Sequence, residues 1–199
     1  MRQLLIATSN EGKLREIFGL LDGMVENVIS LSHVHGIILP HETGQTFEEN
    51  ALIKARHAAT EAGIPALADD SGLEVDILGN RPGVYSARYA GDGATDEKNN
   101  EKLLDELKGV SFELRTARFV SSIACCYPDG TCLTFAGVLS GVILDHPRGE
   151  QGFGYDPLFL VPEYGKTLAE LPLEVKNHIS HRARAFAAFK EYLVATNSS

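Results

Sequence analysis

The chain has 199 residues, of which 44% are hydrophobic and 23% are charged, a composition typical of folded globular proteins. Residues 1–199 therefore fit a single domain, which can have lobes but shows no separable linker. The net charge of −9 argues against binding to nucleic-acid polymers or to anionic membranes, although a local basic pocket could still hold a small anion.

Strands and helices alternate along the first half of the chain. Apolar runs and apolar spacing predict strands over residues 3–8, 25–31 and 64–69 and helices over residues 14–23 and 46–63. Thr46 and Glu49 form a capping box at the start of the second helix, and Gly63 ends it. The first apolar run does not fit a signal peptide, and no apolar segment approaches the roughly 20 residues that cross a membrane.

The second half predicts a long hairpin between two further helices. We expect a loop over residues 78–91, a helix over 95–109, a hairpin over 116–144, a glycine-rich loop with a short strand within 149–166, and a helix from near Ser180. This order of elements indicates a mixed α/β fold.

The three cysteines lie close to the Pro-Asp-Gly turn of this hairpin. Cys125 and Cys126 are adjacent, so they should point to opposite faces of a strand. Because the count is odd and no Cys-x-x-Cys pair occurs, we expect Cys125, Cys126 and Cys132 to be reduced packing residues of a cytoplasmic protein.

Two helix starts carry basic side chains, which the helix dipole disfavours there. Lys13 lies in the first turn of a helix after the polar turn 8–12, and His181 and Arg182 follow the expected cap Ser180. A bound anion would remove the conflict, because unpaired backbone N–H groups also point outward at helix starts. The alternative is a solvated surface side chain, which in the first case follows an asparagine cap.

Asp69 and Asp70 end the predicted strand 64–69. They should project to opposite faces, although both could tilt toward solvent at the end of the strand. Crowded carboxylates need a cation or hydrogen bonds, and Mg²⁺ prefers one or two carboxylates together with phosphates and water. The alternative is a polar turn. Glu42 is a possible further metal ligand, and Asn50 and Lys54 lie on a polar stripe that either reaches the same site or faces solvent.

Phe153 lies between two glycines in the sequence "GFGYDP". Glycine lets the backbone approach a ligand closely, and an exposed ring offers a face on which a nucleobase can stack. A tight loop around a buried Phe153 is the alternative.

Five motifs at matching separations resemble the inosine/xanthosine triphosphate pyrophosphatases. They are "ATSNEGKLREI", "TFEENALIKA", "ADDSGLEVDILGNRPGVYSARYAG", "GFGYDPLF" and "ISHRARAF", and together they reach from Ala7 to Phe186. The resemblance implies a two-lobed α/β fold, with an elongated mixed sheet flanked by helices and a central cleft. It also implies a homodimer, dependence on Mg²⁺, and hydrolysis of a purine nucleoside triphosphate (ITP, dITP or XTP) to the monophosphate and pyrophosphate.

The same resemblance assigns roles to individual residues. It implies that Asp70 is the catalytic carboxylate and a metal ligand, and that Glu42 is a second metal ligand. It implies substrate contacts by Thr8, Ser9, Asn10, Glu11, Gly12, Lys13, Ser71, Phe153, Gly154, Tyr155, Asp156, Lys176, His181 and Arg182. Relatives often have an acid where this chain has His41.

Two other functions remain open at this point. One is a Mg²⁺-dependent pyrophosphatase for modified pyrimidine triphosphates, and the other is a nucleotide-binding sensor that does not hydrolyse its ligand. The sequence does not decide whether Asp69 or Asp70 accepts the proton of water. It also leaves open the preference among ITP, dITP and XTP, the rejection of GTP, the number of metal ions and the surface of a dimer.

Overall fold

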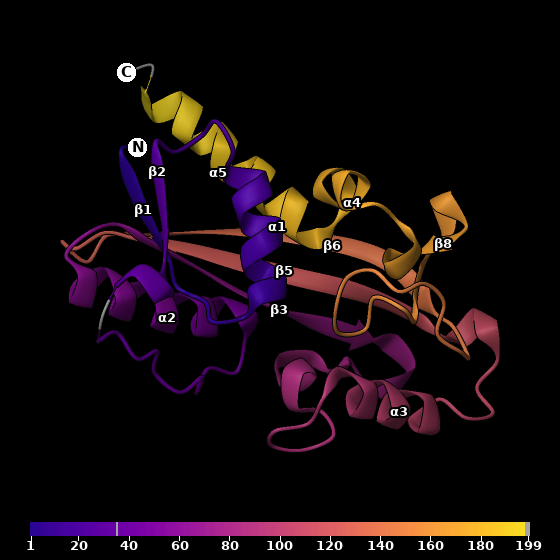
Figure 1. Cartoon of the computed structure of the whole chain (residues 1–199). Coiled ribbons are helices and arrows are strands. Elements are labelled where there is room, and N and C mark those ends of the chain that lie inside the picture. The colour runs from indigo at the N-terminus through magenta and orange to yellow at the C-terminus, as the bar shows by residue number, and fades with distance from the viewer. Residues whose placement is uncertain (35, 198–199) are drawn as a thin grey trace. The chain divides into compact units, whose positions relative to one another are not determined.

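The computed structural model describes residues 1–34 and 36–197 (Figure 1). The strands are β1 (Gln3–Ile6), β2 (Asn27–Ser30), β3 (Ala66–Val75), β4 (Arg81–Pro82), β5 (Thr116–Cys126), β6 (Cys132–Ile143), β7 (Phe159–Val161) and β8 (Lys166–Thr167). The α-helices are α1 (Glu11–Leu21), α2 (Phe47–Ala62), α3 (Asp96–Glu106), α4 (Leu173–Ile179) and α5 (His181–Asn197).

The described strands form one eight-stranded sheet. Its order is β2-β1-β3-β5-β6-β7-β8, and β4 pairs with β3 outside this path. β1 is parallel to β2 and β3, whereas β7 is antiparallel to β6 and β8. The sheet is therefore mixed, and the predicted α/β fold is confirmed. The central cleft stays a prediction.

Two compact units can be distinguished within the described chain. Unit 1 comprises Met1–Asp70, Ser121–Gly137 and the chain from His181 onward, and unit 2 comprises Ser71–Val120 and Val138–Ser180. Strands β3, β5 and β6 each contribute residues to both units, so no linker segment lies at these borders. The expectation of a single domain stays a prediction.

In unit 1, successive residues of a strand face different helices. Leu4 and Ile6 of β1 share one cluster with Ile17 of α1 and Phe186 of α5, whereas Leu5 lies in a second cluster on α2. The side of α2 in this second cluster carries the small residues Ala51, Ala55, Ala58 and Ala59, all fully buried. This period of two applies equally to β3 and β5, and it decides which helices their polar residues meet.

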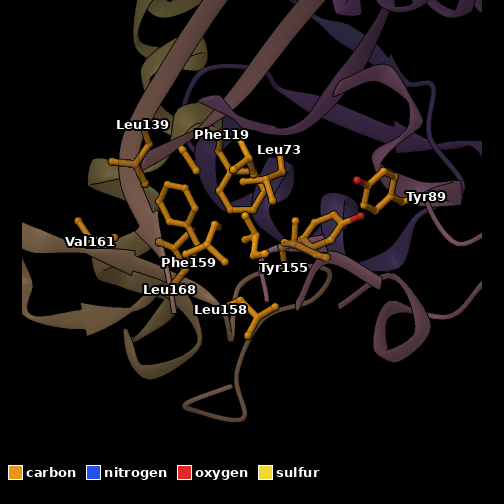
Figure 2. Close-up of a cluster of buried hydrophobic side chains, with 14 of the residues drawn as sticks. Leu73, Tyr89, Phe119, Leu139, Tyr155, Leu158, Phe159, Val161 and Leu168 are labelled. Atoms are coloured by element: carbon orange, nitrogen blue, oxygen red, sulfur yellow. The ribbon is translucent and has the colours of Figure 1, made fainter. Parts of the chain in front are cut away.

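Unit 2 has its own hydrophobic core (Figure 2). Phe119 of β5 and Phe159 of β7 are central to it, with ring centroids 4.7 Å apart. Leu103 and Leu107, from α3 and its C-terminal cap, are fully buried in the same cluster. Aromatic pairs at this separation add about 0.5–1.5 kcal/mol beyond their buried area. This core supports the loop over residues 149–158.

Most predicted elements are confirmed, including the capping box of α2, the hairpin of β5 and β6 and the C-terminal helix. Two boundaries were wrong: α1 begins at Glu11 and not at residue 14, and β3 continues to Val75, so Asp69 and Asp70 lie within it. The short helix α4 was not predicted, because seven residues carry little periodic signal. No helix in the described part of the chain is long and apolar enough to span a membrane.

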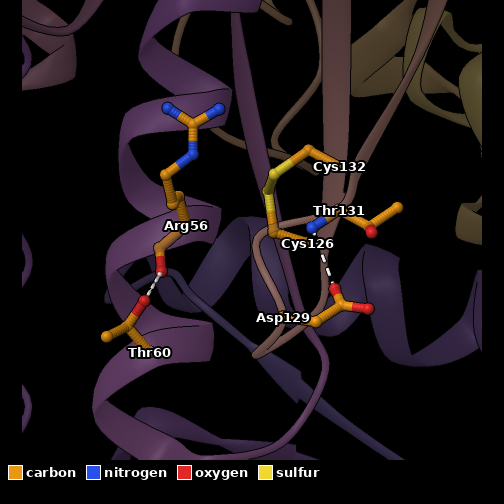
Figure 3. Close-up of a disulfide and its surroundings, with 6 residues drawn as sticks. All are labelled: Arg56, Thr60, Cys126, Asp129, Thr131 and Cys132. Carbon is orange, nitrogen blue, oxygen red and sulfur yellow. Dashed lines mark hydrogen bonds between the residues drawn. A yellow bond between two sulfur atoms is a disulfide. The ribbon is translucent and has the colours of Figure 1, made fainter.

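The expectation that all three cysteines are reduced was wrong (Figure 3). Cys126 and Cys132 form a disulfide, because the turn between β5 and β6 brings their Cα atoms to 4.1 Å. Cys125 remains a free thiol on the opposite face of β5, in the cluster with α5, and its burial raises its pKa to about 12. The prediction that Cys125 and Cys126 face opposite sides is confirmed.

Candidate active site

The adjacent aspartates of β3 meet different helices in unit 1. Ala66 and Ala68 face α2 and Leu67 faces α1 and α5, so the alternation of side chains directs Asp70 toward α2 and Asp69 toward α1 and α5. Asp69 is fully buried and Asp70 is 5% exposed. Two carboxylates within a strand at such burial require compensating charge on each face.

Asp69 is compensated by two cations and a hydroxyl. Its Oδ2 lies 2.8 Å from Lys13 Nζ and 3.1 Å from Arg182, and Ser121 Oγ donates to its Oδ1 at 2.6 Å. Burial opposes its ionisation, but Arg182 and Lys13 hold the pKa of Asp69 well below its usual value. Asp69 is therefore a permanently charged anchor and a weak base.

Arg182 joins α5 to α1 through buried carboxylates. Its guanidinium is 1% exposed and donates to Glu16 as well as to Asp69. Burial alone would lower its pKa, but Asp69 and Glu16 raise it overall. The alternative of a solvated surface Arg182 is therefore wrong, and so is that of a solvated Lys13, whose side chain is 14% exposed.

Asp70 shares a single lysine with Glu42. Lys54 Nζ lies 2.9 Å from Asp70 Oδ1 and 2.8 Å from Glu42 Oε1, and Asn50 Nδ2 donates to Asp70 Oδ2 at 3.2 Å. Burial raises the pKa of Asp70 above its usual value, Lys54 and Lys13 oppose this, and Glu42 adds to it. The two neighbouring aspartates thus have pKa values shifted in opposite directions.

The polar turn before α1 presents backbone donors beside Lys13. Asn10 caps the helix by accepting from Lys13 N–H at 2.9 Å, and Thr8 Oγ1 accepts from Asn10 N–H at 3.2 Å. Thr8 is buried, whereas Ser9, Asn10 and Glu11 are exposed and Gly12 is half-buried. The expected asparagine cap and the basic first turn therefore coexist.

The donor set around Lys54 fits a divalent cation of the magnesium type. No group of three or more His, Cys, Asp or Glu side chains suited to a metal occurs in the described residues. Magnesium does not need one, because it commonly takes one or two protein carboxylates and completes its shell with phosphates and water. Asp70 and Glu42 both contact the ammonium group of Lys54, so the two carboxylates are close enough to bind the same cation.

Unit 2 gathers four of the other expected site residues in one loop. Lys176 Nζ of α4 lies 2.6 Å from Asp156 Oδ2, which also accepts from Phe153 N–H at 3.2 Å. Lys176 Nζ lies 5.8 Å from the centroid of the half-buried Phe153 ring. Tyr155 is buried and donates its hydroxyl to Ser86 O at 2.8 Å. Gly152 has φ +84°, and a side chain there would collide with the Asp156 carboxylate.

The remaining expected residues, Ser71 and His181, are chain neighbours of Asp70 and Arg182. Ser71 follows Asp70 in β3 and is half-buried, and His181 is the buried first residue of α5, next to Arg182. The polar stripe of α2 does not face solvent at Asn50 and Lys54, which are 0% and 6% exposed, so the alternative of a solvated face is wrong. Glu16 and Ser121 were not predicted, because their partners Arg182 and Asp69 are distant in the chain.

Comparison with known proteins places the chain in a family. Residues 4–192 match the model of the Ham1 family. The chain is 58% identical over 97% of both chains to a protein of Geobacter sulfurreducens, and 47% identical over 98% of both chains to one of Bacillus subtilis. Both are named dITP/XTP pyrophosphatase.

Solved structures agree with the sequence comparison. A HAM1 protein from Coxiella burnetii superposes with a TM-score of 0.88 at 42% identity, covering 98% of this chain and 100% of the other. A nucleoside-triphosphatase / dITP/XTP pyrophosphatase from Mycobacterium abscessus gives 0.76 at 42% identity, covering 94% and 98%. The resemblance seen in the five motifs is confirmed, and the chain belongs to the Ham1 family.

Proposed function

We propose that this protein hydrolyses the deaminated purine triphosphates ITP, dITP and XTP to the monophosphate and pyrophosphate, and so removes them from the nucleotide pool. The relatives named dITP/XTP pyrophosphatase support the substrate class. The observation that carries the proposal is the burial of two neighbouring carboxylates in an acidic chain, each of them paired with its own cations.

Phosphate binding is assigned to the start of α1 and to α5. Lys13 and Arg182 supply positive charge next to the N–H groups of the turn from Thr8 to Gly12. Asp69 orients both cations and does not contact the phosphates, because a carboxylate and a phosphate repel each other. Ser71 and His181 lie one residue from Asp70 and Arg182 and are assigned to substrate contacts.

Asp70 and Glu42 would hold Mg²⁺ together with the phosphates. When bound, the ion supplies charge neutralisation for the pyrophosphate that leaves. Asp70 accepts the proton of the attacking water, because burial raises its pKa and makes its carboxylate the stronger base of the pair. Lys54 keeps Asp70 oriented and ionised before the reaction.

Base recognition is assigned to Phe153, Gly154, Tyr155, Asp156 and Lys176. The Phe153 ring supplies a stacking face, and the Lys176 ammonium can donate to a 6-keto oxygen. Hypoxanthine and xanthine present that acceptor, whereas adenine presents an amino donor at the same position. A site that donates there should therefore disfavour ATP by about 1–3 kcal/mol per unpaired group.

A homodimer and a cytoplasmic location complete the proposal. Hydrolysis of ITP, XTP, dITP, GTP and ATP, with and without Mg²⁺, tests it, with the products separated by ion-exchange chromatography. We expect the monophosphate and pyrophosphate from ITP and XTP, in the presence of Mg²⁺. Fastest turnover of a modified pyrimidine triphosphate would contradict the substrate class, and binding of ITP without release of pyrophosphate would indicate a sensor.

A further inference from the structure

Helix α3 holds the loop of residues 153–156 through the backbone of one residue. Asp96 Oδ2 accepts from the N–H of Gly154 at 2.6 Å, and Asn100 Nδ2 donates to the carbonyl oxygen of Gly154 at 3.0 Å. Asp96 and Asn100 are four positions apart, so they lie on the same side of α3. Both polar backbone groups of Gly154 are thus bound by side chains of a single helical turn.

The clamp includes one atom whose burial destabilises the fold. Asn100 Oδ1 is buried and has no hydrogen-bond partner within the described part of the chain. A buried acceptor in that state is unfavourable, and an apolar residue of similar size would avoid it. The benefit of an asparagine at position 100 is therefore its one bond to Gly154.

The clamp acts beside the ring that is assigned to the base. Gly154 directly follows Phe153 and has φ +61°, a left-handed conformation that glycine adopts without strain. The rest of the loop is fixed independently, by Lys176 on Asp156 and by the Tyr155 hydroxyl on Ser86. Asp156 also accepts from the N–H of Phe153, so the contacts of α3 add a second restraint next to Phe153, on the backbone of Gly154.

We propose that Asp96 and Asn100 are positioning residues for base recognition, which act by holding Gly154 so that Phe153 is presented to the purine. The inference rests on the proposed role of residues 153–156 in base binding. It requires that the loss of either side chain weakens the binding of ligands with a base and leaves the binding of a bare polyphosphate unchanged.

Hydrogen exchange at the Gly154 amide tests the clamp without substrate. In the full-length ¹⁵N-labelled protein, we expect Asp96→Ala to accelerate exchange at this amide about tenfold, because a charge-assisted bond is lost. Asp96→Asn should preserve most of the protection, since its amide oxygen can still accept. Glu97→Ala is the matched control, because it removes a neighbouring first-turn carboxylate that does not contact Gly154. Unchanged exchange in Asp96→Ala would overturn the proposal.

Kinetics test the consequence for the base. In Asp96→Ala and Asn100→Leu we expect the KM for ITP to rise about tenfold (about 1.4 kcal/mol), with kcat within about twofold. The inhibition constant of tripolyphosphate should not change in either variant. An unchanged KM, or an equal loss of tripolyphosphate binding, would overturn the proposal. Absence of pyrophosphate release by the wild type would instead contradict the proposed function, and the exchange experiment would still decide whether the clamp exists.

Discussion

Lys54 is a position at which the structure predicts a large loss of stability from the removal of one charge. Lys54→Met keeps most of the apolar stem of the side chain and removes the ammonium group. That group contacts Asp70 at 2.9 Å, Glu42 at 2.8 Å and the Asp69 carbonyl oxygen at 3.0 Å. Because Asp70 is 8% exposed as a side chain, it would stay in the interior without its ion-pair partner.

The magnitude follows from these burial values. Removing one partner of a buried ion pair costs about 3–5 kcal/mol, whereas the pair with the 29% exposed Glu42 adds at most about 1 kcal/mol. We therefore expect Lys54→Met to lower the free energy of unfolding by about 4 kcal/mol at pH 7. The loss should diminish with falling pH, since Asp70 has a raised folded-state pKa and is neutral in both states below its ordinary value of 3.8.

Urea denaturation in EDTA, at pH 7 and pH 4.5, measures this effect. The double variant Lys54→Met/Asp70→Asn should recover most of the loss, because neither charge then remains. Lys98→Met is the matched control, since that lysine is exposed on α3. A loss below about 1 kcal/mol for Lys54→Met, or no recovery in the double variant, would refute the assignment of Lys54 as the main counter-charge of Asp70.

Three further predictions address catalysis, cysteine chemistry and pH. Asp70→Asn should reduce kcat for ITP by at least about 100-fold while the circular dichroism spectrum is retained, because a general base contributes about 10²–10⁴; near-normal turnover would assign the base elsewhere. Ellman titration of the unfolded, unreduced protein should detect only the Cys125 thiol, and reduction should add two more; three thiols before reduction would exclude the disulfide. Glu170→Gln should lower the melting temperature at pH 7 but not near pH 2, since Arg148 lowers the pKa of Glu170 from 4.5 to about 2 and its contribution disappears as pH falls through that interval; an equal effect at both pH values would contradict the pairing.

Local sequence signals predicted most of the fold. The capping box of α2, the Pro-Asp-Gly turn of the hairpin and the apolar periods of the main helices depend on residues within a few positions of one another. The length of β3 was less accessible, because Asp69 and Asp70 are poor strand formers whose charges are balanced by residues far away in the chain.

The candidate site was predicted only where the chain carries a recognisable conflict. Lys13 and Arg182 were found because basic residues at helix starts oppose the dipole. Glu16 and Ser121 carry no such signal, since a glutamate within a helix and a serine within a strand are ordinary until their partners are known. The disulfide was missed because an odd number of cysteines does not specify a pair.

Because side chains alternate along β3, a shift of this strand by one residue would move every one of them to the opposite face of the sheet. Deleting one residue from the segment that leads into Ala66 would move Asp70 onto the face of α1 and α5 and leave Ser71 beside Asn50 and Lys54. Asp70 would then contact Lys13 and Arg182, the cations that now lower the pKa of Asp69. The site therefore depends on the number of residues before this strand as well as on the identity of the residues within it.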